Sequence, residues 1–212
     1  MAVHASKEYP GLAFDYDAGQ NPFFKTMVKE NLRLLKKLGT GQLLLDSIKK
    51  ATPSYRSKEF KGGINVIIKP PLSRSWVAPG IGMKAGVATL VDQNKFNAFK
   101  AGQGQMVATM ASKTQTQPDN AAASTSGGSV CWLFYSNTEI YSGSGEWLIP
   151  HITLGHELIH CLRALEGKSK PVGDKTEEWA TTGIKGESYF ITENDLRKEA
   201  GIPPRTKYFH DD

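Results

Sequence analysis

Apolar side chains recur every three or four residues in two stretches near the N-terminus, which predicts two amphipathic helices. The first helix begins after Pro22 and ends at Gly39, and the second covers residues 42–51. Two other stretches, residues 64–69 and 129–137, are mostly apolar without this spacing and predict buried strands. Helices and strands are therefore expected in the same chain.

The helical spacing returns in the last third of the chain and predicts three more helices. The clearest covers residues 150–167, a short one opens at Glu177, and the third covers residues 192–200. No internal repeat is visible. The expected architecture is a single α+β domain over residues 1–212.

Three segments lack a regular pattern. Residues 1–20 are expected to form a loose N-terminal arm. Residues 111–129 hold no large apolar side chain and are expected to form a surface loop or flap. Residues 72–110 are rich in glycine with short apolar pieces, and the sequence assigns no structure to them.

The composition is that of a globular protein. Apolar residues make up 39% and charged residues 22%, which excludes disorder throughout the chain. Lys and Arg outnumber Asp and Glu by 26 to 21, a small excess that is spread along the chain and falls short of a nucleic-acid-binding signature. No apolar run approaches the roughly 18 residues of a membrane span, and the N-terminus lacks the apolar segment of a Sec signal peptide.

These features lead to expectations about thiols and partners. The two cysteines, Cys131 and Cys161, are expected to be reduced, because nothing indicates Sec export to an oxidising compartment. A chain of 212 residues buries enough surface to fold without a partner, so we expect a monomer. We expect neither nucleic-acid binding nor stable membrane insertion.

The strongest chemical signal is the H-E-x-x-H motif formed by His156, Glu157 and His160 in the helix predicted over residues 150–167. Histidines four residues apart differ by about 40° around a helix axis, so both imidazoles leave one face and can bind one ion. In metalloproteases with this motif the ion is zinc, and the Glu is the general base for a metal-bound water. One Zn²⁺ per chain is predicted. A surface helix with two chance histidines is disfavoured, because apolar residues flank the motif.

A third protein ligand is expected downstream of His160. Glu177 and Glu178 open the next predicted helix, and because neighbours lie about 100° apart around a helix, only one of them can point at the ion. The spacing does not decide between them, and acids at a helix N-terminus are also favoured by the helix dipole. An oxyanion-stabilising group is needed as well. Arg205 and Tyr208 follow the last predicted helix, where spacing alone gives surface positions.

Three sequence blocks together resemble the NleD-like zinc metalloproteases, which Gram-negative pathogens inject into host cells by type III secretion. The blocks are HELIH, GDKTEEWATTG and SYFITENDLRKEAGIPPRTKY, in that order. The site is also similar to that of the clostridial neurotoxin light chains, in which HELIH is followed by E-E-L and a later R-x-x-Y. This similarity implies Glu178 as the third zinc ligand, with Glu177 as the alternative because the intervening loop is shorter here. It also implies that Arg205 and Tyr208 stabilise the oxyanion.

The resemblance implies a zincin-like α+β fold, with a small mixed or antiparallel sheet packed on the motif helix, and a gluzincin-type endopeptidase. It further implies secretion without a Sec signal peptide, action in the host cytosol and cleavage of specific host proteins such as signalling kinases. Zincins often bind substrate along the strand before this helix, so backbone groups near residues 129–137 are candidates for pairing with a peptide, and the sequence does not identify the exact strand.

Three alternative functions stay open at this stage. The chain could be a zinc-binding pseudoenzyme that acts as an interaction module, a metal-dependent toxin against competing bacteria, or a basic nucleic-acid binder. Neither the substrate nor the cleaved bond follows from the sequence.

Overall fold

The computed structural model describes most of the chain outside its middle third. The described residues are 2–16, 18, 22–56, 58–70, 77–78, 81–82, 85–89, 127–135, 140–141, 147–170, 175–187 and 189–207. Within 77–89 and 140–148 only the backbone is described. Residues 111–126 of the loop predicted over residues 111–129, and most of residues 72–110, therefore lie outside the described residues.

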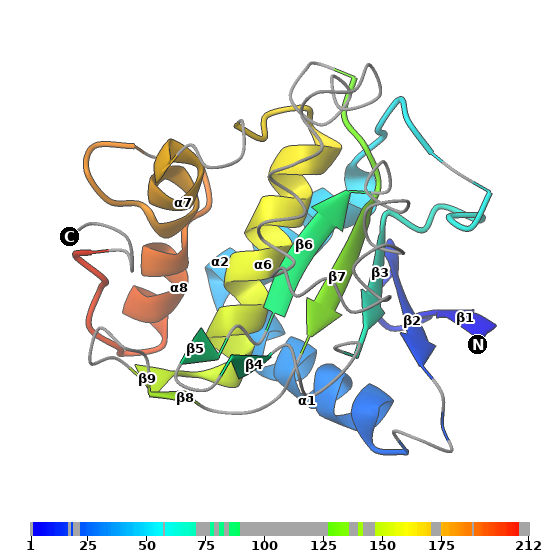
Figure 1. Ribbon diagram of the computed structural model, residues 1–212, viewed down its shortest axis with the longest axis horizontal. Helices are drawn as coiled ribbons and strands as arrows, with labels where there is room; N and C mark the ends of the chain where they lie inside the picture. The colour runs from blue at the N-terminus through cyan, green and yellow to red at the C-terminus, as the bar shows by residue number, and fades with distance from the viewer. Residues whose placement is uncertain are drawn as a thin grey trace.

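A five-stranded mixed sheet forms one layer of the fold (Figure 1). Its three inner strands are parallel to one another, and its two edge strands are antiparallel to their neighbours. In spatial order the strands are β1 (Ala2–Ala5), β2 (Leu12–Tyr16), β3 (Val66–Lys69), β7 (Cys131–Tyr135) and β6 (Ala85–Thr89). Two short antiparallel pairs lie outside this sheet: β4 (Val77–Ala78) with β5 (Ile81–Gly82), and β8 (Ile140–Tyr141) with β9 (Trp147–Leu148).

The N-terminal segment is part of this sheet, so the prediction of a loose arm over residues 1–20 was wrong. Strand β2 is buried, and it pairs in parallel with β3 through Leu12 opposite Val66. Strand β1 folds back on β2 in antiparallel register. The partner strand β3 is distant in sequence, so no local pattern indicated this pairing.

The helices form a second layer and a flanking group. The described helices are α1 (Phe24–Lys36), α2 (Gly39–Lys50), α6 (Pro150–Leu165), α7 (Lys175–Thr182) and α8 (Glu193–Glu199). Helix α6 runs along β6 and β7, and α1 and α2 pack against α6 (Figure 1). Helices α7 and α8 lie on the side of α6 that is away from β1, β2 and β3 (Figure 1). The α+β class is confirmed, whereas the zincin-like fold stays a prediction.

Helix α6 is the central helix of the fold. Twelve of its sixteen residues are buried, which is typical of a helix covered on nearly all sides. Pro150 occupies the first turn, where its missing N–H costs no hydrogen bond, and the Tyr135 hydroxyl on β7 donates to the Pro150 carbonyl at 3.0 Å. Gly155 lets α8 approach, because a Cβ there would lie 2.5 Å from Cδ1 of Leu196. Side chains on α6 are thus held in fixed positions.

The end of the predicted surface loop is packed against α6, which corrects the expected boundary at residue 129. Gly128 and Ser129 are buried. The Ser129 amide donates to the Ala164 carbonyl at 2.9 Å. A Cβ on Gly128 would lie 1.8 Å from the Leu165 carbonyl oxygen, so only glycine fits there.

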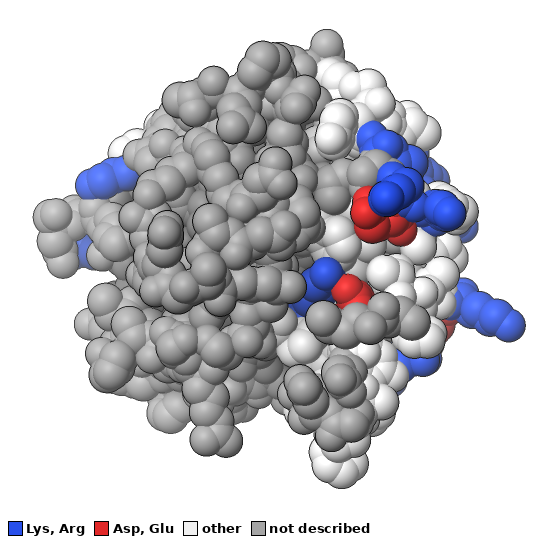
Figure 2. Space-filling view, turned by 45° about the vertical axis from the view of Figure 1, so that its right-hand side comes forward, with Lys and Arg blue, Asp and Glu red and all other residues white. Residues whose placement is uncertain are grey.

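The charged surface of the N-terminal helices is partly neutralised. Lys29 on α1 pairs with Glu8 from the segment between β1 and β2, and Arg33 pairs with Glu30 within α1; all four side chains are exposed. On the face shown in Figure 2, the described basic side chains occur in small groups, with acidic side chains beside some of them.

No helix in the described part of the chain is long and apolar enough to cross a bilayer. Cys131 and Cys161 are both buried and free.

Candidate metal centre

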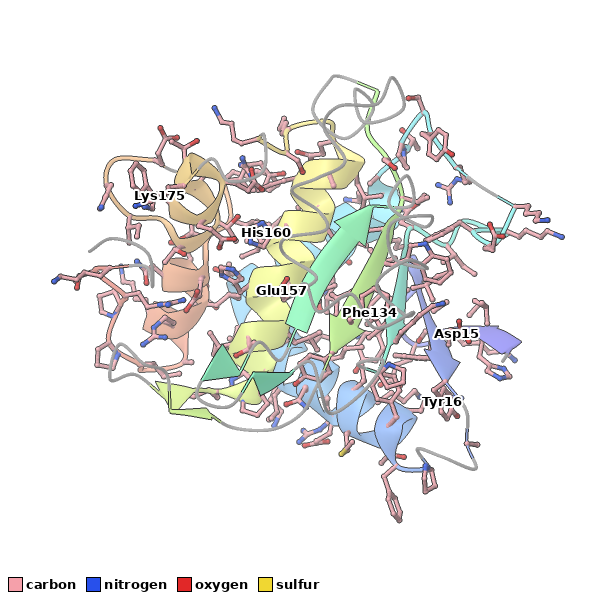
Figure 3. The ribbon with its side chains drawn as sticks, in the orientation of Figure 1. Asp15, Tyr16, Phe134, Glu157, His160 and Lys175 are labelled. Atoms are coloured by element: carbon pink, nitrogen blue, oxygen red, sulfur yellow. The ribbon has the colours of Figure 1, made fainter. Side chains whose placement is uncertain are left out.

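Two imidazoles meet on one side of α6. The Nε2 atoms of His156 and His160 lie 3.1 Å apart, and the ring planes meet at 77°. The spacing of four residues places both side chains on one face of the helix, as the sequence predicted. His160 projects from α6 toward α7 (Figure 3).

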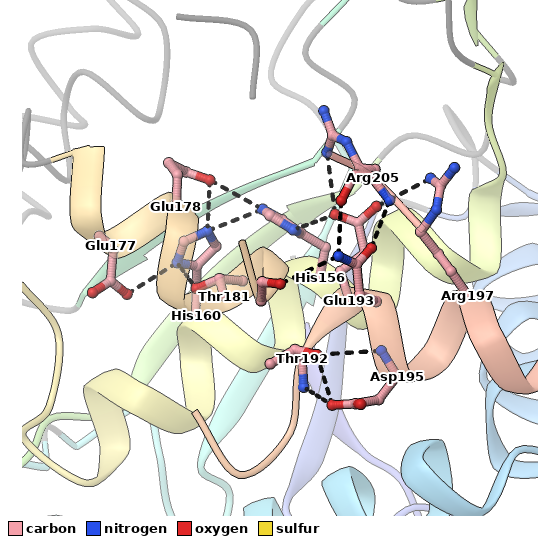
Figure 4. Close-up of polar contacts among 12 residues, drawn as sticks. His156, His160, Glu177, Glu178, Thr181, Thr192, Glu193, Asp195, Arg197 and Arg205 are labelled. Atoms are coloured by element: carbon pink, nitrogen blue, oxygen red, sulfur yellow. Dashed lines mark hydrogen bonds and ion pairs between the residues drawn. The ribbon is translucent and has the colours of Figure 1, made fainter. Parts of the chain in front are cut away.

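Helix α7 adds a carboxylate to this pair. Oε2 of Glu178 lies 3.3 Å from Nε2 of His156 and 3.3 Å from Nε2 of His160. This oxygen is buried and makes no hydrogen bond with any of the described residues. Three donor atoms on two helices therefore converge on one point (Figure 4).

The separations between these atoms fit a metal ion. Zinc binds His nitrogens and carboxylate oxygens at about 2.0–2.2 Å, so neighbouring ligand atoms of a tetrahedral site lie about 3.3 Å apart. The observed 3.1, 3.3 and 3.3 Å agree with this spacing. His156, His160 and Glu178 form a cluster that could hold a metal ion, with a fourth tetrahedral position left for water or substrate.

A second carboxylate orients His156 from behind. Nδ1 of His156 lies 2.9 Å from Oε2 of Glu193, the first residue of α8. Glu193 is held in turn by Nη1 of Arg205 at 3.1 Å and Nη1 of Arg197 at 3.2 Å (Figure 4). Thr192 caps α8 and thereby fixes the position of Glu193.

A carboxylate also orients the imidazole of His160. Its Nδ1 lies 3.1 Å from Oε1 of Glu177 and 3.2 Å from the hydroxyl of Thr181. Glu177 accepts two hydrogen bonds from Arg163 at 2.9 and 2.8 Å. A carboxylate on Nδ1 favours the tautomer that carries its proton there, which leaves the Nε2 lone pair for a metal. Both imidazoles are thus oriented as metal ligands usually are.

The two glutamates of α7 have different environments. Both oxygens of Glu177 accept hydrogen bonds from protein donors, whereas Oε2 of Glu178 faces the two imidazoles without a hydrogen bond. The structure therefore places Glu178, not Glu177, among the converging donor atoms.

The charges in this cluster reinforce one another. Burial lowers the pKa of His156, but the neighbouring Glu178 and Glu193 outweigh it and raise that pKa to about 9. The pKa of His160 is also raised, because Glu178 and Glu177 outweigh its burial. Burial alone would raise the pKa of the three carboxyls. The imidazoles and nearby arginines outweigh burial and hold the pKa of Glu177 and Glu193 at about 2. The imidazoles hold the pKa of Glu178 well below its usual range. A divalent cation would meet ionised carboxylates and displace protons from the imidazoles.

Glu157 lies beside this cluster on α6 (Figure 3). Its side chain is buried, and burial raises its pKa, while the charges of His156 and His160 act in the opposite direction. A raised pKa brings a carboxylate closer to the range in which a general base works best. The position and the environment of Glu157 suit a proton-transfer role.

The structure brings only part of the predicted oxyanion pair to the site. Arg205, expected on the surface by spacing, is 4% exposed and contacts Glu193. Tyr208 lies outside the described residues.

Sequence reasoning missed Glu193, Arg163 and Arg197. A signal for Glu193 was its position directly after the Thr192 cap, and a signal for Arg163 was its place three residues after His160, on the same side of α6.

Comparison with known proteins assigns the family. The peptidase family M91, described as effector proteins, matches residues 14–208, a range that holds every residue of the candidate metal centre. No curated protein matches the chain. The chain belongs to the M91 peptidase family, and the resemblance to NleD-like effector metalloproteases is confirmed.

Proposed function

We propose that this member of the M91 family is a zinc-dependent endopeptidase of the gluzincin type, with one Zn²⁺ held by His156, His160 and Glu178. The observation that carries the proposal is the convergence of three donor atoms within 3.3 Å of one another beside a buried glutamate. Membership of a peptidase family supports the protease part of this proposal independently.

Each side chain has a defined task in this proposal. When bound, zinc supplies a Lewis acid that polarises a carbonyl and lowers the pKa of water toward about 7. Glu157 accepts a proton from the attacking water and passes it to the amine that leaves. Glu193 and Glu177 keep the two imidazoles in the required tautomer and orientation.

Charge develops on the carbonyl oxygen of the scissile bond and needs a donor. Arg205 and Tyr208 are proposed for this task. In support, Arg205 is buried and lies one contact away from the metal ligand His156, through Glu193. Its guanidinium is therefore close to the proposed reaction centre rather than on the outer surface.

The sheet topology suggests which strand a peptide substrate would pair with. Strand β7 lies in the segment predicted to pair with a peptide, but it has neighbours on both sides, β3 and β6, so its backbone is already paired. Among the described strands, β6 is last in the order, and it runs beside α6. A peptide that adds to the sheet would therefore do so along β6, next to the helix that bears the metal ligands.

We also propose where this protein acts and which proteins it cleaves. The family consists of effector proteins, and we propose type III secretion, action in the host cytosol and cleavage of specific host proteins such as signalling kinases. The enzyme would act as a monomer on protein substrates, without nucleic acid and without inserting into a membrane.

The test is a search for new protein N-termini in eukaryotic cytosolic extract treated with the wild type or with Glu157→Gln. Zinc content is measured in both proteins first. A small set of new termini produced only by the zinc-loaded wild type would establish the protease and name its substrates. Identical termini from two zinc-loaded proteins would contradict the proposal and favour a zinc-binding interaction module. Growth arrest of bacteria that express the wild type would favour an antibacterial toxin.

A further inference from the structure

We propose that Arg163 is a positioning residue of the metal centre. It holds Glu177 away from the ion, orients His160 through Glu177, and anchors α7 so that Glu178 becomes the third ligand. The inference rests on the proposed metal site and deepens it.

Arg163 follows His160 by one helical turn and lies at the junction of α6 and α7. It is 4% exposed, and its Nε and Nη2 atoms donate to Oε1 and Oε2 of Glu177 at 2.9 and 2.8 Å. Two parallel hydrogen bonds between a guanidinium and a carboxylate fix distance and angle together. The pair therefore ties α7 to α6 at the first turn of α7, where Glu178 is the next residue.

The hydrogen bonds of Glu177 leave it no free site for a metal. Oε1 accepts from Nε of Arg163 and lies 3.1 Å from Nδ1 of His160. Oε2 accepts from Nη2 of Arg163 and from the backbone amide of Lys170 at 2.7 Å. Each oxygen thus has two protein partners. Glu178, about 100° further around the helix, keeps an oxygen that has no hydrogen bond within the described part of the chain.

Arg163 is itself held in place from the other side. Its Nη2 donates to the Lys168 carbonyl at 3.1 Å, and its guanidinium lies 5.1 Å from the ring centroid of Tyr189. The Tyr189 hydroxyl donates to Glu166. One arginine therefore joins the end of α6, the turn that follows it, α7 and the segment before α8. A fixed second layer of this kind maintains the geometry of metal ligands.

Only arginine can make all of these contacts. Lysine keeps the charge but has no planar fork, so it cannot bind both carboxylate oxygens in one orientation or stack in the same way on Tyr189. Methionine keeps much of the buried stem and removes the charge. The two replacements separate the contribution of charge from that of geometry.

The experiment measures metal affinity in Arg163→Lys, Arg163→Met and Glu177→Gln, by competition with a chelator for Zn²⁺ and by the visible absorption of bound Co²⁺. We expect about 10- to 100-fold weaker Zn²⁺ binding in Arg163→Met and Glu177→Gln, and a changed Co²⁺ spectrum. Arg163→Lys should show an intermediate loss. The double variant Arg163→Met/Glu177→Gln should bind Zn²⁺ no more weakly than the weaker-binding single variant, because both residues act through one contact.

Arg56→Met is the matched control. Arg56 also anchors a loop, through Asn65 Oδ1 at 2.6 Å and the carbonyls of Phe60 and Ile64, but it does not contact the metal centre. The Arg56→Met variant should have a lower melting temperature with unchanged Zn²⁺ affinity and an unchanged Co²⁺ spectrum. This control separates a positioning effect on the metal ligands from a general loss of stability.

The outcomes distinguish the two proposals. A wild type that binds no Zn²⁺ would contradict the proposed function itself. Wild-type affinity and an unchanged spectrum in Arg163→Met would overturn the role of Arg163 while the metal site stands. If Arg163→Met does not fold, Glu177→Gln decides, since it removes the same ion pair with a nearly isosteric side chain.

Discussion

Nε2 of His156 lies 3.1 Å from Nε2 of His160, close enough for one cation to bind both nitrogens. Each ring places its other nitrogen against a carboxylate, Glu193 behind His156 and Glu177 behind His160. Two lone pairs that face each other at this distance repel unless a proton or a metal lies between them. With Glu178 as the third donor, the cluster could hold a metal ion, and its spacing fits the proposed zinc with one position left for water or substrate.

The general base should be separable from the metal site. Glu157→Gln keeps the size of the buried side chain but cannot accept a proton, so we expect activity to fall about 10²- to 10⁴-fold. Zinc content and melting temperature should stay at wild-type values. Cleavage of the first substrate site identified, together with metal analysis, checks both. Wild-type turnover in this variant would remove Glu157 from the mechanism.

Arg205 has two possible modes of action, and kinetics separate them. As an oxyanion donor, its replacement by Ala should lower kcat by about 10²- to 10³-fold with zinc content unchanged. We expect this result. If zinc is lost instead, Arg205 acts by holding Glu193 against His156. Glu193→Gln is the comparison, since it breaks the contact with His156 directly.

The buried carboxylates predict acid sensitivity of the metal-free protein. Burial raises the pKa of Glu193, but His156, Arg205 and Arg197 outweigh this and hold it at about 2, below its value of about 4.5 in the unfolded chain. Unfolding therefore binds protons, and the stability that Glu193 contributes is present above about pH 4.5 and lost as the pH falls toward about 2.

Denaturant titrations between pH 6 and 2, with a chelator present, test whether the free energy of unfolding falls with pH in this way. The wild type should lose stability more steeply than Glu193→Gln, by up to about 1.4 kcal/mol per pH unit for the one proton involved. Equal slopes in the two proteins would show that Glu193 is not held ionised in the folded state.

Gly128 should be nearly intolerant of substitution. It has φ +62, and a Cβ would lie 1.8 Å from the Leu165 carbonyl oxygen at the end of α6. We expect Gly128→Ala to destabilise the protein by about 2–5 kcal/mol, from backbone strain and steric overlap together. Gly62→Ala is the matched control, because Gly62 has φ +63 with nothing within 4 Å. Gly62→Ala should lower the free energy of unfolding by only about 1–2 kcal/mol.

Local patterns in the sequence predicted the elements that local interactions determine. The spacing of His156 and His160 on one helix face, the Pro150 start of α6 and the Thr192 cap of α8 all appear in the structure. Strand β7 appears where the apolar run predicted it. These features depend on residues within a few positions of one another, which is why a single sequence shows them.

The features that were missed depend on distant parts of the chain. Strand β2 is buried because it pairs with β3, and the short segment before Tyr16 has no pattern that reveals this partner. Glu193 reaches His156 only because α8 packs on α6 beside Gly155. The choice between Glu177 and Glu178 likewise depends on Arg163, whose partner is a matter of tertiary packing. Such contacts cannot be derived from spacing alone.

The zinc content per chain of three purified proteins tests whether His156, His160 and Glu178 hold one zinc ion. After loading with Zn²⁺ and removal of the excess, the wild type and Glu157→Gln should each hold one zinc ion, and Glu178→Gln should hold far less. Both variants exchange a Glu for Gln, one in the cluster and one beside it, and only Glu178→Gln removes a predicted ligand. Full zinc content in Glu178→Gln would remove Glu178 from the ligand set, and none in the wild type would rule out the proposed zinc site.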